Sequence, residues 1–262
     1  MDELSQQMPM KSISFAGHTR EELRLLAPTT LVVLPLGATE QHGPHLPVGT
    51  DYYTVEHLGL EAAKAAAKQI PVVVAPALPY GCSEHHLPFG ATLSLQTEVY
   101  YRVVCDLLRS LALDGFRSVF LLNGHGGNHE LIQLAARDTA LKHPILVGAA
   151  SYWHLAWEGL VGLDAHQGAG LPGHAGRFET SVMLALRGPM VSSKQPHRDV
   201  VVGSDPNRPT PLWRNERHGS WQAIDGYTDS PDNATAELGE RYLPVLIDSV
   251  ARTLIEFYRS AA

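Results

Sequence analysis

The chain has 262 residues, of which 44% are hydrophobic and 18% charged, a composition typical of one large folded domain and unlike that of a disordered protein. Its net charge of −7 argues against a nucleic-acid surface, and no apolar run approaches the length of a membrane span. Its two cysteines cannot form a disulfide framework, and its N-terminus does not resemble a signal peptide. We therefore expect a single soluble, cytoplasmic domain over residues 1–262, with no nucleic-acid or membrane partner.

Strand-like and helix-like segments alternate along the chain. In chain order, the expected elements are a strand at 29–36, a helix at 52–68, a strand at 71–76, a helix at 97–113, a strand at 117–122, a helix at 130–142, a strand at 145–150, and helices at 178–186 and 234–260. Short apolar strands separated by amphipathic helices are typical of a mostly parallel sheet with helices on both faces. The sequence therefore predicts a fold of the α/β class.

A polar cluster follows each of the four expected strands. The clusters read GATEQHGPH, YGCSEHH, NGHGGNH and SYWH, in chain order. In open parallel sheets, binding sites form at the carboxyl ends of the strands, and these ends lie at one edge of the sheet. The four loops are therefore expected to converge on one site.

The first cluster contains three possible metal ligands, Glu40, His42 and Asp51. In an extended segment Glu40 and His42 point the same way, about 6–7 Å apart, which lets each bind a different ion of a metal pair. Asp51 could bridge both ions through its two oxygens, or it could cap the helix that follows. Glu40 and His42 could instead form a buried hydrogen-bonded pair. His45 lies nearby and could support a ligand without binding metal.

Two later clusters add further candidates. In NGHGGNHE, glycines let the backbone turn sharply, and His125 projects from the end of a strand. The alternative is a glycine-rich turn that binds phosphate through its amides, although no P-loop pattern is present. In GHAGRFETS, Glu179 lies near a helix start, where it could bind metal or interact with the helix dipole. His174 precedes two small residues and could act as a general acid or base.

The candidate ligands make up two imidazoles and three carboxylates: Glu40, His42, Asp51, His125 and Glu179. This set suits a binuclear site for two divalent ions, Zn, Mn or Fe, and the lack of a thiolate argues against a structural zinc site. Two cations would acidify a bridging water into a nucleophile near neutral pH. The predicted cofactors are therefore two divalent metal ions.

Five motifs in this order resemble the creatininase (creatinine amidohydrolase) family: GATEQHGPHLPVGTD, YGCSEHHLPFGATLSL, NGHGGNH, SYW and HAGRFETS. The resemblance covers most of the chain. It implies a three-layer α/β/α sandwich with a parallel sheet, a binuclear metal centre at the strand ends and, in many members, a homohexamer. By motif it implies that Glu40, His42, Asp51 and His125 are ligands, with Asp51 bridging, and that His174 transfers a proton.

The resemblance also concerns the substrate pocket. Trp153 in SYW resembles a tryptophan that lines the pocket in creatininase proper. The third motif departs from the NGHxEN of creatininase proper, because Gly127 stands where that motif has its ligand glutamate. Glu179 is the natural substitute, as in other branches of the family. The glycine changes the pocket floor and weakens the case for creatinine as the substrate; other branches include a mycofactocin precursor peptidase, a formamidopyrimidine deformylase and hydrolases of cyclic ketones.

Two further segments remain open to more than one interpretation. His85 and His86, after the second expected strand, either contact substrate or are ordinary loop histidines; we assign substrate contact to His86. Residues 190–232 are rich in Pro, Gly, Asp, Asn and Arg, which indicates a long surface loop, or else a lid or an oligomer contact. Within them, Trp213 and Trp221 either pack on the surface or cover the site from a neighbouring subunit.

The leading hypothesis is a metal-dependent amidohydrolase that breaks a cyclic or other non-peptide C–N amide bond of a small molecule with a metal-bound hydroxide. His174 would carry the proton to the leaving nitrogen. The alternative enzyme is a metallopeptidase or deformylase acting on a short peptide or a formamide. A protein of a different class would bind a ligand at the same site without turnover. We also expect a homo-oligomer, a hexamer by resemblance.

Overall fold

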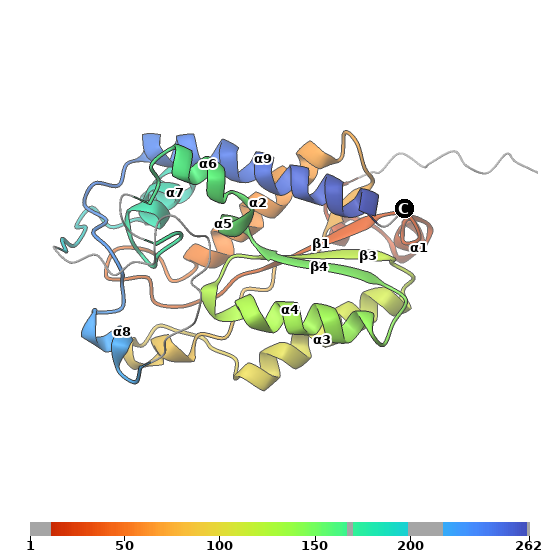
Figure 1. Cartoon of the computed structure of the whole chain (residues 1–262), viewed down its shortest axis with the longest axis horizontal. Coiled ribbons are helices and arrows are strands. Elements are labelled where there is room, and N and C mark those ends of the chain that lie inside the picture. The colour runs from red at the N-terminus through yellow and green to blue at the C-terminus, as the bar shows by residue number, and fades with distance from the viewer. Residues whose placement is uncertain (1–11, 167–169, 199–216, 261–262) are drawn as a thin grey trace, which may run out of the picture.

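A parallel sheet forms the centre of the computed structural model, which describes residues 12–166, 170–198 and 217–260 (Figure 1). Within these residues the sheet has four strands in the order β2-β1-β3-β4. The strands are β1 (Leu31–Leu36), β2 (Val72–Val74), β3 (Ser118–Asn123) and β4 (Leu146–Ser151). All pairs are parallel, as predicted, and β1 and β3 pair over their full length. The predicted α/β class is confirmed.

Helices cover both faces of the sheet, which gives three layers (Figure 1). The helices α2 and α9, with α5 to α7 beside them, lie on one face, and α3 and α4 lie on the other. The helices are α1 (Arg20–Leu26), α2 (Thr50–Ala66), α3 (Thr97–Leu113), α4 (His129–Ala140), α5 (Tyr152–Leu155), α6 (Trp157–Gly162), α7 (Arg177–Arg187), α8 (Ser220–Ala223) and α9 (Ala236–Ser260). Short 3₁₀ helices are η1 (Phe15–Gly17), η2 (Glu84–Phe89), η3 (Gly126–Asn128) and η4 (Gly188–Met190). Among the described residues, none of these helices has the length and apolar character needed to cross a bilayer.

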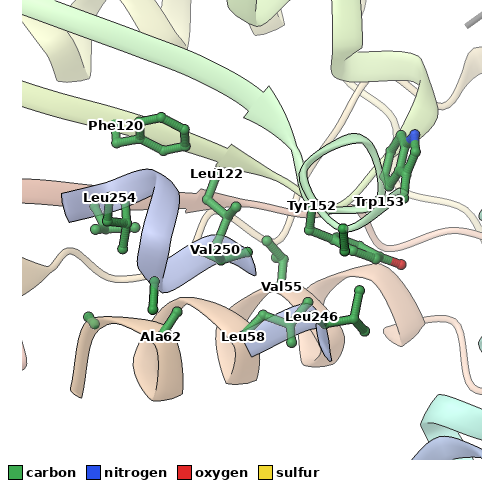
Figure 2. Packing of buried hydrophobic residues seen from close by; sticks show 14 of the residues in the cluster. Val55, Leu58, Ala62, Phe120, Leu122, Tyr152, Trp153, Leu246, Val250 and Leu254 are labelled. Carbon is green, nitrogen blue, oxygen red and sulfur yellow. The ribbon is translucent and has the colours of Figure 1, made fainter. Parts of the chain in front are cut away.

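Alternation along the strands divides the core into two layers. In β3, Phe120 and Leu122 face α2 and α9, whereas Val119 and Leu121 face α3 and α4. Figure 2 shows the first of these layers, where side chains of α2 and α9 close over the sheet. Each fully buried large apolar side chain contributes about 1.5–3 kcal/mol, so both layers hold the sheet rigidly beneath the loops at its carboxyl edge. Strands buried on both faces explain the continuous apolar runs in the sequence.

The start of α2 corrects one interpretation of Asp51. The helix begins at Thr50, two residues before the predicted start, and its N-cap is Gly49. Asp51 therefore lies inside the first turn and is not the capping residue, although its charge still suits the helix N-terminus. This position leaves the carboxylate available to other groups.

The segment 190–232 is only partly described, because residues 199–216, which include Trp213, lie outside the described part of the chain. The described remainder contains α8, a single helical turn with Gly219 before it and Gly226 after it, both at positive φ. Figure 1 places α8 at the end of the molecule beyond the carboxyl edge of the sheet, close to the loop that carries η2. This part of the segment therefore lies over the predicted site.

Candidate metal centre

The loops that follow β1 and β3 bring the first candidate ligands together. β1 and β3 are adjacent, and the Gly124 N–H donates to Leu36 O at 2.8 Å, which extends their pairing to the start of both loops. The loop after β1 is closed by the Glu40 N–H, which donates to Val48 O at 2.8 Å. This closure returns the chain to the sheet edge, so that Asp51 at the start of α2 lies beside the side chains of residues 40 and 42.

Asp51 lies between two histidines from different loops. Its Oδ1 is 3.1 Å from His42 Nε2, and its Oδ2 is 2.9 Å from His125 Nδ1. The side chains of all three are almost completely buried. Because each oxygen faces a different imidazole, this carboxylate has the geometry of a bridging group.

The other two carboxylates extend the cluster on opposite sides of Asp51. Glu40 Oε1 lies 3.2 Å from His125 Nδ1, and Glu179 Oε2 lies 3.8 Å from His42 Nε2. Glu179 is in the first turn of α7 and also accepts a hydrogen bond from the Ala175 N–H at 2.6 Å. The structure therefore brings together all five residues that the sequence predicted as ligands. Their role as ligands stays a prediction.

Donor atoms within 4.8 Å of one another form three groups suited to a metal ion among the described residues. The groups are His42 with Asp51 and Glu179, Glu40 with His85 and His125, and Glu40 with His42 and His174. The first group contains Asp51, the second lies on the other side of that carboxylate, and the two groups share no residue. Nitrogen and carboxylate oxygen donors in such groups suit zinc, manganese or iron.

Buried oxygens in the cluster accept no well-aligned hydrogen bond from the described residues. These oxygens are both carboxylate oxygens of Glu40 and Oδ2 of Asp51, although His125 Nδ1 lies 3.2 Å from Glu40 Oε1 and 2.9 Å from Asp51 Oδ2. Glu40 is fully buried, and Asp51 is 4% exposed. Carboxylates buried this deeply need positive charge beside them, and a cation in their midst would supply it.

The pKa values of the clustered side chains also indicate a site for a cation. Burial lowers the pKa of His42, but the carboxylates around it, Asp51 foremost, together outweigh burial and raise the pKa to about 10. Burial likewise opposes protonation of His125, whereas Glu40 and Asp51 raise its pKa well above the usual value. Burial raises the pKa of Glu179 to about 8, against the attraction of His42. The imidazolium charges balance the carboxylates, and a divalent cation can take over that role with release of those protons.

Neighbouring groups orient the candidate ligands. His125 Nε2 lies 3.0 Å from Cys82 O and 3.2 Å from Ser83 Oγ, which leaves Nδ1 to face the carboxylates. His45 is buried, with Nε2 2.8 Å from Thr180 Oγ1, and its role as a supporting residue stays a prediction. Such partners fix the ring orientation of metal-binding histidines.

His174 and His86 line one side of the cluster. His174 Nδ1 is 3.7 Å from Glu40 Oε1, and His86 Nε2 is 3.6 Å from the same oxygen. Their rings stack with centroids 4.2 Å apart. Burial lowers the pKa of His174 to about 3 and that of His86 to about 2, so both rings are neutral at pH 7. Both are placed to contact a molecule held beside the carboxylates.

A cavity of about 670 Å³ opens onto the cluster. His86 and Gly127, which we expected to contact substrate, both line it. Other lining residues are Glu40, Asp51, His125, His174, Glu179 and Trp221. A drug-sized ligand fits a cavity of this volume.

Comparison with known proteins identifies the family. The creatininase family model, described as creatinine amidohydrolase, matches residues 17–254. The chain belongs to the creatininase family. It is 32% identical over 224 residues to the mycofactocin precursor peptide peptidase of Mycobacterium ulcerans, covering 83% of this chain and 81% of the relative. It is 31% identical over 256 residues to the creatinine amidohydrolase of Pseudomonas putida, covering 90% and 92%.

Solved creatininase structures share the fold. The structure named "Creatininase Mn" has a TM-score of 0.76 at 27% identity and covers 94% of this chain and 98% of that one. A mutant creatininase of the "Zn-Zn type" has a TM-score of 0.75 at 28% identity, with the same coverage. These likenesses confirm the creatininase resemblance and the three-layer α/β/α fold predicted from the sequence.

Gly127, which stands where the NGHxEN pattern has its glutamate, lies at a position with no room for a side chain. A Cβ atom at this position would lie 2.1 Å from Cys82 O and 2.6 Å from His125 Nε2. Backbone must therefore move before any side chain fits, and the carbonyl that must move is the one that orients His125. In this loop geometry a glutamate at position 127 has no room.

We expect Gly127→Ala to lower the stability by about 1–3 kcal/mol through overpacking, a fall in Tm of roughly 2–10 °C, and to weaken metal binding by displacing His125. Thermal melts and metal analysis of the purified protein measure both effects. Gly126→Ala is the matched control, because a Cβ there meets nothing within 4 Å. Equal melting temperatures and metal contents for the two variants would contradict the steric argument.

The two tryptophans of interest occupy places that the sequence did not predict. Trp153 does not line the cavity of the described chain; β4 runs directly into α5, and the indole, 5% exposed, packs in the core beside Tyr152 (Figure 2). Trp221 on α8 reaches the cavity from the same chain, with its ring centroid 4.6 Å from that of His86 and 5.4 Å from that of His174. Among the residues that the structure describes, Trp221 is the tryptophan at the cavity wall.

Proposed function

We propose that the protein is a metal-dependent hydrolase that cleaves an amide C–N bond of a small molecule. The observation that carries the proposal is Asp51, whose two oxygens face different imidazoles, His42 and His125, at 3.1 and 2.9 Å. A carboxylate in this position could serve two cations at once, and Glu179 and Glu40 would add a donor on either side. The proposed cofactors are two divalent ions, with zinc, manganese or iron all compatible with the donors.

The chain's own residues supply positioning and proton transfer. When bound, the cations would supply Lewis acidity and lower the pKa of a water ligand. His174, with Nδ1 toward Glu40, is placed to accept the proton that the attacking water loses as its oxygen adds to the amide carbon. The same nitrogen returns that proton to the leaving nitrogen as the C–N bond breaks, so that the products are a carboxylic acid and an amine. Trp221 packs on the stacked rings of His86 and His174 at the cavity wall, and these three side chains limit the access of bulk water to the cluster.

Metal removal tests the proposal. We expect dialysis against a strong chelator to abolish amide hydrolysis, and added Mn²⁺ or Zn²⁺ to restore it. Circular dichroism before and after dialysis controls for unfolding, because loss of fold would also abolish activity. Full activity in protein shown by elemental analysis to be free of metal would overturn the proposal.

The leading substrate class is a cyclic or other non-peptide amide, and a short peptide is the second candidate. The second candidate is favoured by the 32% identity to a relative named as a peptide peptidase and by a cavity of about 670 Å³, which has room for more than one small ring. A panel of lactams, formamides and short peptides separates the two classes and also tests the deformylase alternative. Hydrolysis of the peptides alone would favour the second candidate.

Two further features stay predictions that rest on resemblance and composition. A homohexamer is expected from the family resemblance, and light scattering coupled to size-exclusion chromatography measures the assembly directly. A cytoplasmic location is expected from the composition.

A further inference from the structure

Gln41 lies between the two candidate ligands Glu40 and His42, and its carboxamide is buried. Its Oε1 accepts a hydrogen bond from the Gly43 N–H at 2.9 Å, and its Nε2 donates to Gly226 O at 2.8 Å. Exchanging the oxygen and nitrogen would place oxygen against the Gly226 carbonyl and two donors against each other at Gly43. The orientation of the carboxamide is therefore determined by its partners.

Gly226 packs directly on this carboxamide. Its φ is +71°, and a Cβ atom there would lie 2.8 Å from Gln41 Nε2. The glycine lets the turn after α8 approach closely enough for its carbonyl to accept one of the two amide hydrogens. One hydrogen of the Gln41 amide remains.

His174 cannot take that remaining hydrogen. Its Nε2 lies 2.9 Å from the backbone oxygen of Gln41, which only accepts, so this ring nitrogen carries a hydrogen. The 3.2 Å approach of Gln41 Nε2 to His174 Nε2 is then a contact between two donors. Nδ1 is therefore the one nitrogen of this ring that can be without a hydrogen, and it lies 3.7 Å from Glu40 Oε1.

His86 takes the remaining hydrogen. Its Nδ1 is 2.8 Å from Gln41 Nε2, so this nitrogen accepts and the hydrogen of the neutral ring lies on Nε2. That Nε2 is buried, makes no hydrogen bond to any residue that the structure describes, and lies 3.6 Å from Glu40 Oε1. His86 therefore turns an N–H toward Glu40 Oε1, whereas His174 turns a nitrogen without a hydrogen toward the same oxygen.

We propose that Gln41 is a positioning residue that fixes the tautomers of His86 and His174. Both rings carry their hydrogen on Nε2, but they are turned differently, so that His86 presents an N–H and His174 a bare nitrogen to the same corner of the cavity. The His86 N–H can donate to the substrate's carbonyl or leaving-group side, while His174 Nδ1 accepts a proton. This use of the pair rests on the proposed hydrolysis. The tautomers themselves do not, because they follow from the contacts of Gln41 with Gly43, Gly226, His86 and His174.

The tautomers are measurable without a substrate. Long-range ¹H–¹⁵N NMR of zinc-loaded, full-length protein labelled at histidine distinguishes Nδ1–H from Nε2–H rings, and His86→Phe and His174→Phe variants assign the signals. We expect Nε2–H tautomers for both rings. In Gln41→Glu the introduced carboxylate accepts and cannot donate, so His86 gains a hydrogen on Nδ1 while His174 keeps its own tautomer.

Gln133→Glu is the matched control, because Gln133 Nε2 also contacts a histidine, at 3.0 Å, but on the exposed face of α4. It should leave the His86 signals unchanged. If Gln41→Glu does not fold, Gln41→Met removes the donor, and the His86 ring should then show both tautomers. An Nδ1–H tautomer in the wild-type protein, or an unchanged ring in a folded Gln41 variant, would overturn the inference.

Activity gives a second measurement once the panel has yielded a substrate. We expect Gln41→Glu to lower kcat about 100-fold, with little change in KM, and to keep its metal. A Gln41→Glu/His86→Phe double variant should be no slower than the slower single variant, since Gln41 acts through His86. Additive losses in the double variant would contradict that coupling. Failure of the chelation test with unchanged tautomers would reject the hydrolase and leave the role of Gln41 standing.

Discussion

Asp51→Asn is expected to abolish metal-dependent hydrolysis and to remove both metals from the purified protein. Its two oxygens serve both sides of the cluster, toward His42 and toward His125. The asparagine amide keeps the shape but replaces one acceptor with an NH₂ group, which repels a cation. Mutation of a residue that merely supports a metal ligand already lowers metal affinity or activity by about 10–100-fold. For Asp51→Asn we therefore expect activity to fall by more than about 100-fold.

Elemental analysis and activity measurements separate a bridging Asp51 from a ligand of one ion. Glu179→Gln is the comparison, because Glu179 faces only the His42 side and should cost one metal where Asp51→Asn costs two. Asp248→Asn is the surface control, since its exposed carboxylate pairs with exposed Arg252 on α9, away from the cluster. Retention of one full equivalent of metal by Asp51→Asn would show that this carboxylate does not bridge.

Much of the fold could be predicted because its strands are buried on both faces. Such strands read as continuous apolar runs, and all four were found within two residues of their observed starts. The helix α1 was missed because none of its residues is buried, so no apolar stripe marks it. The start of α2 was misplaced because its N-cap, Gly49, offers no capping side chain.

The candidate ligands were predictable because the residue types that bind metal stand in short motifs directly after the strands. Carboxylates and imidazoles beside glycines at the ends of apolar strands indicated a site, and the parallel topology indicated that these ends meet. The departure at Gly127 was visible in the sequence, but its cause was not. The steric limit depends on the Cys82 carbonyl, which comes from a different loop.

Long-range contacts account for what the sequence did not reveal. Gln41 meets Gly226 across 185 positions, and no periodicity or motif links the two. That contact holds the turn after α8, and with it Trp221, over the site, and the Thr228 N–H donates to His174 O at 3.0 Å in the same segment. Trp153 was assigned by motif to the pocket, yet the turn from β4 into α5 directs it into the core of this protomer.

His174→Gln is expected to lower kcat by about 10²–10⁴-fold while leaving the metal content unchanged. The glutamine amide can still donate to the Gln41 carbonyl, as His174 Nε2 is placed to do at 2.9 Å, but it has no basic nitrogen to carry a proton. Steady-state kinetics and elemental analysis of the same preparation measure both quantities. His143→Gln, before β4 at the opposite end of the sheet, is the control.

The metal content decides between two roles for His174. Its donor atoms also lie within 4.8 Å of those of Glu40 and His42, so the ring could bind a cation instead of moving a proton. A proton carrier loses kcat with its metal retained, whereas a ligand loses metal and activity together, and added metal then restores part of the rate. Loss of metal in His174→Gln would therefore reject proton transfer as its primary role and extend the candidate ligand set to this residue.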